Sequence, residues 1–328
     1  MKTEIIYSYK PPEGFCINKV VTIDEQTIII LNWKYRTPSL IHILVNNSII
    51  KQINLSDFKD FDSSDPYNAF FKYKNGFGLV NNTDIVLLCE DIYSTPVLIN
   101  ISNPFPADSF GRRHTAKFAD YYQENQSLYF GIEEISSGGY PARHWAKLEI
   151  TQTSNEILSA KWNCLYELPI RLYPETKLRP QLEKEKSWDY YIFSRKNDWL
   201  NINNIMVKNN LLFIPTDGGR LTRAKSGIQY EYSLISVLNL ENRLIANHEI
   251  EEGKGNFTFS KDKYLLNSRS KRNKIFIYNT EDFQIESEIT ISPKQNLGTE
   301  KNMNLSTNIV GETFYLYNGF FLNLCIIV

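Results

Sequence analysis

A short unit of two apolar stretches separated by a few polar residues recurs along this chain of 328 residues. Five copies are clear and a sixth, weaker copy lies near the C-terminus; they span residues 18–31, 78–90, 120–133, 204–216, 257–267 and 307–317. In each copy the second stretch is apolar at consecutive positions, as expected of a strand buried on both faces. Each unit therefore predicts a tight β-hairpin, and several hairpins of one kind predict an array of similar small sheets.

The composition supports strands over helices. The chain holds 20 Tyr and 19 Phe together with many Ile residues, and aromatic and β-branched side chains favour the pleated, half-buried surface of a sheet. No long segment carries apolar residues at the spacing of an amphipathic helix. The sequence therefore predicts an all-β fold.

The spacing of the units predicts a radial arrangement. The predicted second strands begin at intervals of about 43 to 57 residues, with one interval of about 84 before Leu211. A third and a fourth strand follow most of the hairpins, and the fourth strands alternate, as in Phe283 and Ile285 against Gln284 and Glu286. A gradient from buried inner strands to half-exposed outer strands favours a ring of sheets over a single sandwich.

This organisation resembles the β-propeller class in general, over nearly the whole chain. Neither the GH…WD signature of WD-type blades nor the Gly-Gly doublet of kelch blades occurs at a repeated position. The resemblance implies one domain over residues 1–328 with six blades, and residues 165–203 as an insertion or connection. A strand at 188–194 would allow a seventh blade. We expect residues 4–9 to pair with the last unit and close the ring, which would remove exposed sheet edges.

Charge and cysteine content exclude several classes of function. The formal net charge is -1, so no global field would attract nucleic acid or anionic lipid. The four cysteines are far apart, which favours free thiols, and no Cys/His cluster predicts a metal site. The chain shows neither a signal peptide nor an apolar run of the roughly 20 residues that a membrane span needs. We expect a cytoplasmic protein without a cofactor.

The predicted loops divide into two sets. The hairpin turns are short, whereas the connections expected at the other end of the ring are long and varied, as in 32–38, 90–95, 133–143, 216–227 and 268–272. Loops on a rigid scaffold commonly carry function. Aromatic residues and arginines of the kind enriched in protein-binding hot spots concentrate there. The predicted binding face consists of Trp33, Tyr35, Arg36, Tyr93, Arg112, Arg113, Tyr140, Arg143, Arg220, Arg223, Arg269 and Arg272.

The sequence gives weaker support to catalytic functions. Glu90, Glu133 and Asp217 each follow a predicted inner strand and could flank a glycosidic bond if two of them lay about 5 to 10 Å apart. No nucleophile elbow, partnered histidine or phosphate-binding loop is present. Basic segments such as 220–225 are interrupted by acidic loops, which makes nucleic acid an unfavoured partner.

The sequence thus favours a non-catalytic propeller that binds another macromolecule, most plausibly a protein, through its loop-rich face. A narrower hypothesis is an inhibitor or immunity protein that neutralises a toxin. The alternative hypothesis is a glycan-directed hydrolase or lectin that uses carboxylates and aromatic side chains at the mouth of the ring, and a small-molecule or glycan ligand remains open.

Overall fold

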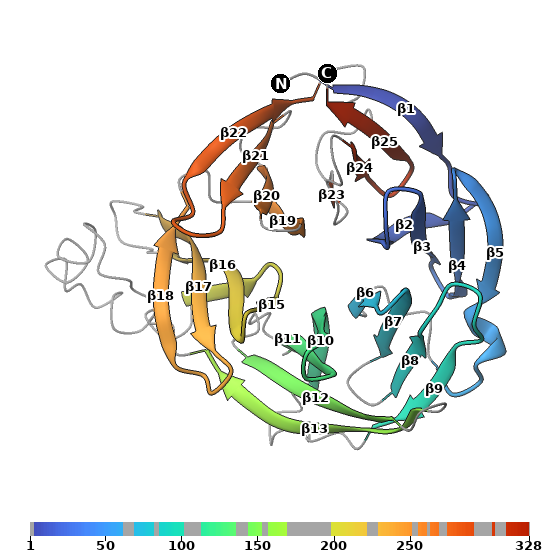
Figure 1. The fold of residues 1–328 in the computed structure, drawn as a ribbon, viewed down its shortest axis with the longest axis horizontal. Coiled ribbons are helices and arrows are strands. Elements are labelled where there is room, and N and C mark those ends of the chain that lie inside the picture. Colours follow the sequence, from blue (N-terminus) through green and yellow to red (C-terminus); the bar gives the residue numbers. More distant parts are fainter. Residues whose placement is uncertain are drawn as a thin grey trace, which may run out of the picture.

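The protein is a ring of six antiparallel sheets around a central axis, in a computed structural model (Figure 1). The structure describes residues 3–61, 69–81, 85–101, 113–135, 144–152, 157–168, 198–221, 229–250, 255–260, 263–268, 274–291, 304–305 and 313–327. This arrangement is a six-bladed β-propeller, and the predicted all-β fold with six blades is confirmed. The segment 188–194, which could have added a seventh blade, lies outside the described residues.

The first three blades follow one another along the chain, each with its first strand nearest the axis (Figure 1). Blade 1 consists of β2 (Cys16–Thr22), β3 (Thr27–Lys34), β4 (Thr37–Val45) and β5 (Ser48–Asn54), followed by the short 3-10 helix η1 (Leu55–Asp57). Blade 2 consists of β6 (Ala69–Tyr73), β7 (Gly76–Asn81), β8 (Ile85–Cys89) and β9 (Val97–Asn100). Blade 3 consists of β10 (Arg113–Tyr122), β11 (Ser127–Ile135), β12 (His144–Gln152) and β13 (Ile157–Glu167).

The remaining blades complete the circle. Blade 4 consists of β14 (Asp198–Ile202) and β15 (Met206–Lys208), which both pair with β16 (Leu211–Leu221), then β17 (Gln229–Asn239) and β18 (Leu244–Glu249). Blade 5 consists of β19 (Gly255–Ser260), β20 (Lys263–Ser268), β21 (Lys274–Asn279) and β22 (Ile285–Thr290). Blade 6 consists of β23 (Asn304–Leu305), β24 (Thr313–Tyr317), β25 (Leu322–Ile327) and β1 (Thr3–Tyr9).

Closure occurs where the two ends of the chain meet. β1 pairs with β25 in antiparallel register from Thr3 opposite Ile327 to Tyr9 opposite Leu322, with one irregularity between Ile5 and Tyr7. The expectation that residues 4–9 complete the last blade is therefore confirmed. The termini lie side by side at the outer rim of the ring (Figure 1).

The proposed insertion at 165–203 has ends that belong to blades. Its first residues lie in β13 of blade 3 and its last residues in β14 of blade 4, while 169–197 lie outside the described residues. A connection between these two blades at 169–197 therefore remains a prediction.

Blade 2 differs from the predicted assignment. The hairpin over 78–90 is formed by β7 and β8, which are the second and third strands, because the run Ala69–Tyr73 forms the first strand. The segment 97–100, expected as a third strand, is the fourth. The prediction was wrong here because β7 and β8 are both apolar at consecutive positions, so their hairpin resembles a hairpin of first and second strands. As a consequence, residues 90–96 connect the third strand to the fourth.

The second strands are buried on both faces because each lies between two neighbouring blades. In β3, Ile29 and Leu31 belong to the core shared with blade 2, whereas Ile28 and Ile30 belong to the core shared with blade 6. The alternation of side chains across a strand sends each set to a different interface. The described residues form six such buried clusters, one at each junction of neighbouring blades. This explains the consecutive apolar residues in the recurring sequence unit.

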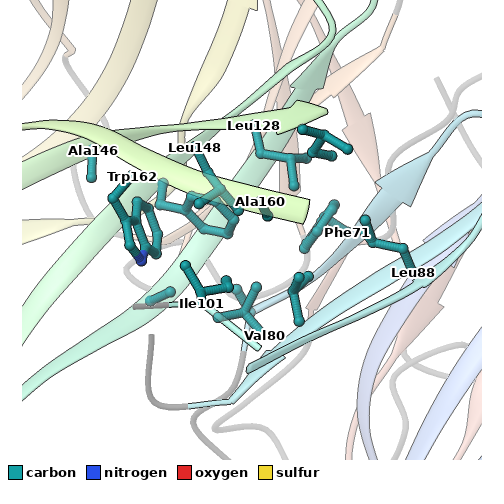
Figure 2. Packing of buried hydrophobic residues seen from close by; sticks show 14 of the residues in the cluster. Phe71, Val80, Leu88, Ile101, Leu128, Ala146, Leu148, Ala160 and Trp162 are labelled. Atoms are coloured by element: carbon teal, nitrogen blue, oxygen red, sulfur yellow. The ribbon is translucent and has the colours of Figure 1, made fainter. Parts of the chain in front are cut away.

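The interface between blades 2 and 3 shows the packing in detail (Figure 2). The ring of Phe71 stands edge-on to that of Phe130 at 5.8 Å, and Phe130 in turn meets Trp162 at 5.0 Å. Edge-to-face pairs of this kind add to the free energy gained by burial alone. Residues from all four strands of blade 3 therefore pack against blade 2.

Three of the four cysteines are described as free thiols. Cys89 and Cys325 are buried in two of the interblade clusters, and burial raises the pKa of Cys89 to about 11 and that of Cys325 to about 12. They act as small apolar side chains in the core. Cys16 is partly exposed. The side chain of Cys164 lies outside the described part of the structure.

We predict that Gly78→Ala destabilises the fold. A Cβ atom at Gly78 would lie 2.2 Å from the ring of Phe71, so the ring must leave its place in the blade 2–3 core. Overpacking of this kind costs about 1–3 kcal/mol. The control is Gly319→Ala, where the nearest atom would be 3.8 Å away. Urea unfolding checks the prediction. Equal free energies of unfolding for the two variants would contradict it, because they would show that the Phe71 ring does not pack tightly against Gly78.

Candidate functional site

The two ends of the ring carry different connections. Connections between second and third strands, and those between blades, lie at one end, which we call the loop end. Turns between first and second strands and between third and fourth strands lie at the other, which we call the turn end. The described turns between first and second strands are short, at 23–26, 74–75, 123–126 and 209–210.

Three predicted binding residues lie together at the loop end of blade 1. Tyr35 and Arg36 form the turn between β3 and β4, and the Tyr35 side chain is 69% exposed. The Arg36 guanidinium lies over the Tyr35 ring at 5.1 Å, and the Trp33 ring meets that ring edge-on at 6.4 Å. A Trp–Tyr–Arg cluster on a tight turn, with Tyr35 and Arg36 exposed, is a preformed surface for a partner.

Two segments brought alongside by ring closure extend this surface. The loop 318–321 connects the second and third strands of blade 6, and residues 10–15 connect β1 to β2. The loop 318–321 is joined to the start of β2, directly after residues 10–15, where the Ile17 amide donates to the Gly319 carbonyl at 2.8 Å. Phe320 is 57% exposed. We call the set Phe15, Trp33, Tyr35, Arg36, Phe320 and Phe321 the aromatic patch.

Lysine side chains cover parts of the aromatic patch. The Lys10 ammonium lies 5.5 Å from the centre of the Phe321 ring, and that of Lys34 lies 5.6 Å from the Phe15 ring. With Arg36 these residues give the patch three cations, against the carboxylate of Glu13 in the same segment. The patch therefore combines exposed rings with a local excess of positive charge, although the chain as a whole is nearly neutral.

Local hydrogen bonds fix the conformation of the loop 318–321. The side-chain oxygen of Asn318 accepts from the amides of Phe320 and Phe321, at 2.7 and 2.9 Å. The Asn318 amide donates to the Phe321 carbonyl at 2.9 Å. An Asn side chain that bonds the backbone two and three residues on is typical of a well-defined turn. The loop is therefore ordered before any partner arrives.

The other two segments of the patch are also tight turns. The Phe15 amide donates to the Pro12 carbonyl at 3.0 Å, and Gly14 between them has φ of +77°, where glycine is free of strain. Arg36 has φ of 54°, a left-handed conformation that costs a residue with a side chain roughly 1–2 kcal/mol. Strain at an exposed arginine is consistent with a role of its side chain outside the fold.

A buried polar network lies directly behind the patch. Tyr9 directly precedes Lys10 in the chain. Its hydroxyl lies 2.8 Å from His42 Nδ1, and His42 Nε2 lies 3.0 Å from Gln52 Oε1. Because the Gln52 amide nitrogen donates to Asn54, its oxygen accepts from His42. His42 thus donates from Nε2 to Gln52, and the Tyr9 hydroxyl beside Nδ1 also donates to the Asn32 side-chain oxygen at 3.2 Å. The network ties β1 of blade 6 to blade 1.

Burial sets the ionisation of this network. It lowers the pKa of His42, whose contact with Gln52 acts weakly in the opposite direction. It raises the pKa of Tyr9 to about 12. Both groups are therefore neutral at pH 7.

Tyr93 and Glu90 lie at the turn end, away from the patch, because 90–96 connects a third strand to a fourth. Tyr93 is 75% exposed. Glu90 accepts from Lys74 at 2.9 Å and from Gln152 at 2.5 Å, which joins blade 2 to blade 3. The Glu90 carboxylate is thus part of a structural ion pair.

The structure separates Glu90 from the other predicted carboxylates. Gln152, which binds Glu90, lies at the end of β12 next to the start of β11, whereas Glu133 lies six residues along β11. At about 3.3 Å per residue this is about 20 Å, more than the separation that paired-carboxylate hydrolysis requires. Asp217 lies in β16, a second strand that also ends at the loop end. The side chains of Glu133 and Asp217 lie outside the described part of the structure.

The structure describes only some of the remaining predicted binding residues. Arg113 lies in β10 and Arg220 in β16, near the loop end of blades 3 and 4, and the structure describes their backbone. The other predicted binding residues lie outside the described residues: Arg112, Tyr140, Arg143, Arg223, Arg269 and Arg272.

Sequence reasoning missed the part of the patch that blade 6 supplies. Phe320 and Phe321 follow a predicted second strand, and Phe15 follows the segment predicted to close the ring. Together these two predictions would have placed all three rings at the loop end beside Trp33. The signal was present, but it required that the ends of the chain be treated as neighbours.

No group of three or more His, Cys, Asp or Glu side chains among the described residues could hold a metal ion. Within the same residues, no helix has the length and apolar character needed to cross a membrane.

Comparison with known proteins shows the fold alone. No protein-family model matches the chain, and no curated protein matches it in sequence. Among solved structures, the WD40 repeats of RRP9 align with a TM-score of 0.50 at 8% identity, over 99% of this chain and 97% of that one. Myxococcus xanthus glutaminyl cyclase aligns with a TM-score of 0.39 at 7% identity, over 100% and 98% of the two chains. A WD40-like propeller is compatible with protein binding, and identity this low carries no function.

We predict that His42 contributes a loss of stability as the pH falls from about 6.5 towards 5, against an opposite contribution from Asp120, whose pKa burial raises to about 7. The folded state holds His42 neutral with a lowered pKa, so the unfolded chain takes up a proton first and unfolding becomes more favourable. The pKa of His248 is also lowered by burial and acts with the same sign. His42→Asn should flatten this part of the stability profile in chemical unfolding, and His248→Asn measures the second contribution. An unchanged slope in His42→Asn would contradict the role of the network.

Proposed function

We propose that this propeller is a non-catalytic protein-binding module that binds its partner through the aromatic patch. One observation carries the proposal: Tyr35 and Phe320 are both exposed at the loop end of neighbouring blades, and the loop that carries Phe320 is fixed by its own hydrogen bonds. Trp, Tyr and Arg dominate the residues that contribute most to protein–protein affinity. Loops that are ordered in advance lose little entropy on binding.

The chemistry of the patch indicates its partner. Exposed rings suit an apolar surface, and the cations of Lys10, Lys34 and Arg36 suit carboxylates around it. We infer a protein partner with an apolar centre and an acidic rim. Such charge complementarity mainly accelerates association and makes it sensitive to salt.

The narrower role that we propose is that of an inhibitor or immunity protein. A rigid face with a preformed hot spot suits tight, long-lived neutralisation of one target, because little free energy is lost in ordering the loops. The glycan-directed hydrolase loses its support at Glu90, whose carboxylate is bonded to Lys74 and Gln152 at the turn end.

The test compares variants of the two ends of the ring. Affinity capture from lysate of the source cells, followed by titration of the captured protein, should show binding reduced about tenfold or more by Tyr35→Ala with Phe320→Ser. Tyr93→Ala is the matched control, since this tyrosine is equally exposed but lies at the turn end. Equal loss in the two variants, or loss in Tyr93→Ala alone, would contradict the assigned face.

Arg36→Gly separates binding from folding. Glycine adopts the left-handed conformation of residue 36 without strain, so we expect the free energy of unfolding to stay the same or to rise by up to about 1 kcal/mol. The same variant removes the guanidinium above Tyr35, so binding of the captured partner should weaken. Unfolding and binding titrations on one preparation check this, and full binding by the variant would remove Arg36 from the site.

A further inference from the structure

A cavity of about 570 Å³ lies on the axis of the ring. Its walls come from the innermost strands of blades 1 to 5, with Tyr317 of blade 6 (Figure 1). This volume falls within the range of pockets that hold small molecules. The cavity is separate from the aromatic patch, none of whose residues lines it.

Positive charge dominates the cavity walls. The lysines that line it are Lys19, Lys72, Lys117 and Lys208, from blades 1, 2, 3 and 4. Among the described lining residues the only carboxyl group is that of Asp120. The chain carries nearly equal numbers of basic and acidic residues, so the cavity wall is more basic than the chain as a whole. Positive charge gathered on the wall of a cleft attracts anions.

Two of the ammonium groups are held in place by the blades. Lys19 Nζ donates to the Lys117 carbonyl at 2.9 Å and lies 5.8 Å from the centre of the Phe118 ring. Lys72 Nζ donates to the Ile23 carbonyl at 2.8 Å. A lysine ammonium has three donors, so the bond of Lys72 to the Ile23 carbonyl fixes its position and leaves donors for a ligand. Burial lowers the pKa of Lys72, and the nearby Asp24 carboxylate acts in the opposite direction.

Asp120 reduces the positive charge less than a free carboxylate would. Its Oδ2 accepts from the Val207 amide at 2.8 Å, which joins blade 3 to blade 4. Desolvation raises the pKa of Asp120 to about 7, against the weaker opposite effect of its backbone hydrogen bonds. The side chain is therefore partly protonated near neutral pH.

The rest of the wall is aromatic and apolar, with Phe70, Phe71, Phe118, Phe257 and Phe259 among its residues. Rings and ammonium groups together describe a site for a molecule with an apolar part and an anionic part.

We propose that the axial cavity binds a small organic anion, with its phosphate or carboxylate group held by the lysines and its ring against the phenylalanines. Lys72 and Lys208 lie at or next to the ends of the first strands of their blades, and therefore towards the turn end. The ligand therefore binds away from the aromatic patch, and the site does not depend on the proposed protein partner.

Isothermal titration with three probes tests the site. Phenyl phosphate carries both features, inorganic phosphate the anion alone and phenol the ring alone. We expect phenyl phosphate to bind with the highest affinity of the three. No measurable binding of phenyl phosphate, or binding no tighter than that of both partial probes, would overturn the proposal.

Variants identify the cavity as the place of binding. Lys72→Gln and Lys208→Gln should each weaken phenyl phosphate binding about tenfold or more, as expected for loss of a charged hydrogen bond. Lys161→Gln is the matched control, because Lys161 lies exposed on the outer strand β13. At pH 8, Asp120→Asn should instead strengthen binding, since it removes a negative charge and keeps an acceptor for Val207.

Opposite signs for lysine and aspartate variants cannot result from general loss of the fold. Equal binding by Lys72→Gln, Lys208→Gln and Lys161→Gln would overturn the site, as would weaker binding by a folded Asp120→Asn. Loss of partner capture by patch variants tests the proposed function separately, because Tyr35 and Phe320 do not line the cavity.

Discussion

The burial of each second strand between two neighbouring blades is the constraint on which this structure depends. A strand such as β3 sends Ile29 and Leu31 to one blade and Ile28 and Ile30 to the other, so neither neighbour can be lost without exposing a full apolar face. Exposure of such a face costs about 25 cal/mol per Å². A linear array would leave two faces of this kind in water, and the closed ring leaves none.

Closure also creates the surface at the loop end. β1 brings Tyr9 into the blade 6–1 core, and the chain then turns through residues 10–15 beside the loop 318–321. The aromatic patch is thus assembled from the first and last parts of the sequence. The same geometry brings five first strands to the axis, where lysines from four blades line one cavity. A packing requirement of the core therefore gives the molecule two chemically different surfaces, at the loop end and on the axis.

Much of the fold could be predicted from the sequence because double-sided burial produces consecutive apolar residues that are visible without coordinates. The prediction was wrong in blade 2, where the short first strand Ala69–Tyr73 follows a polar connection and turns at Lys74 and Asn75 without a glycine. That missing strand reversed the expected end for Glu90 and Tyr93. Trp33, Tyr35 and Arg36 were placed at the correct end because blade 1 was assigned correctly. The position of Phe320 and Phe321 on the neighbouring blade depends on closure, and the cavity depends on side-chain directions, which a strand pattern does not give.

The pairing of β1 with β25 is the central claim, and native-state hydrogen exchange of residues 3–9 tests it most directly. Because β1 is an outer strand, only the amides that point to β25 are bonded within the sheet. The account predicts that these amides exchange as slowly as those of β3, since both open only when the ring opens. Complete exchange of residues 3–9 within seconds, while β3 stays protected, would contradict it.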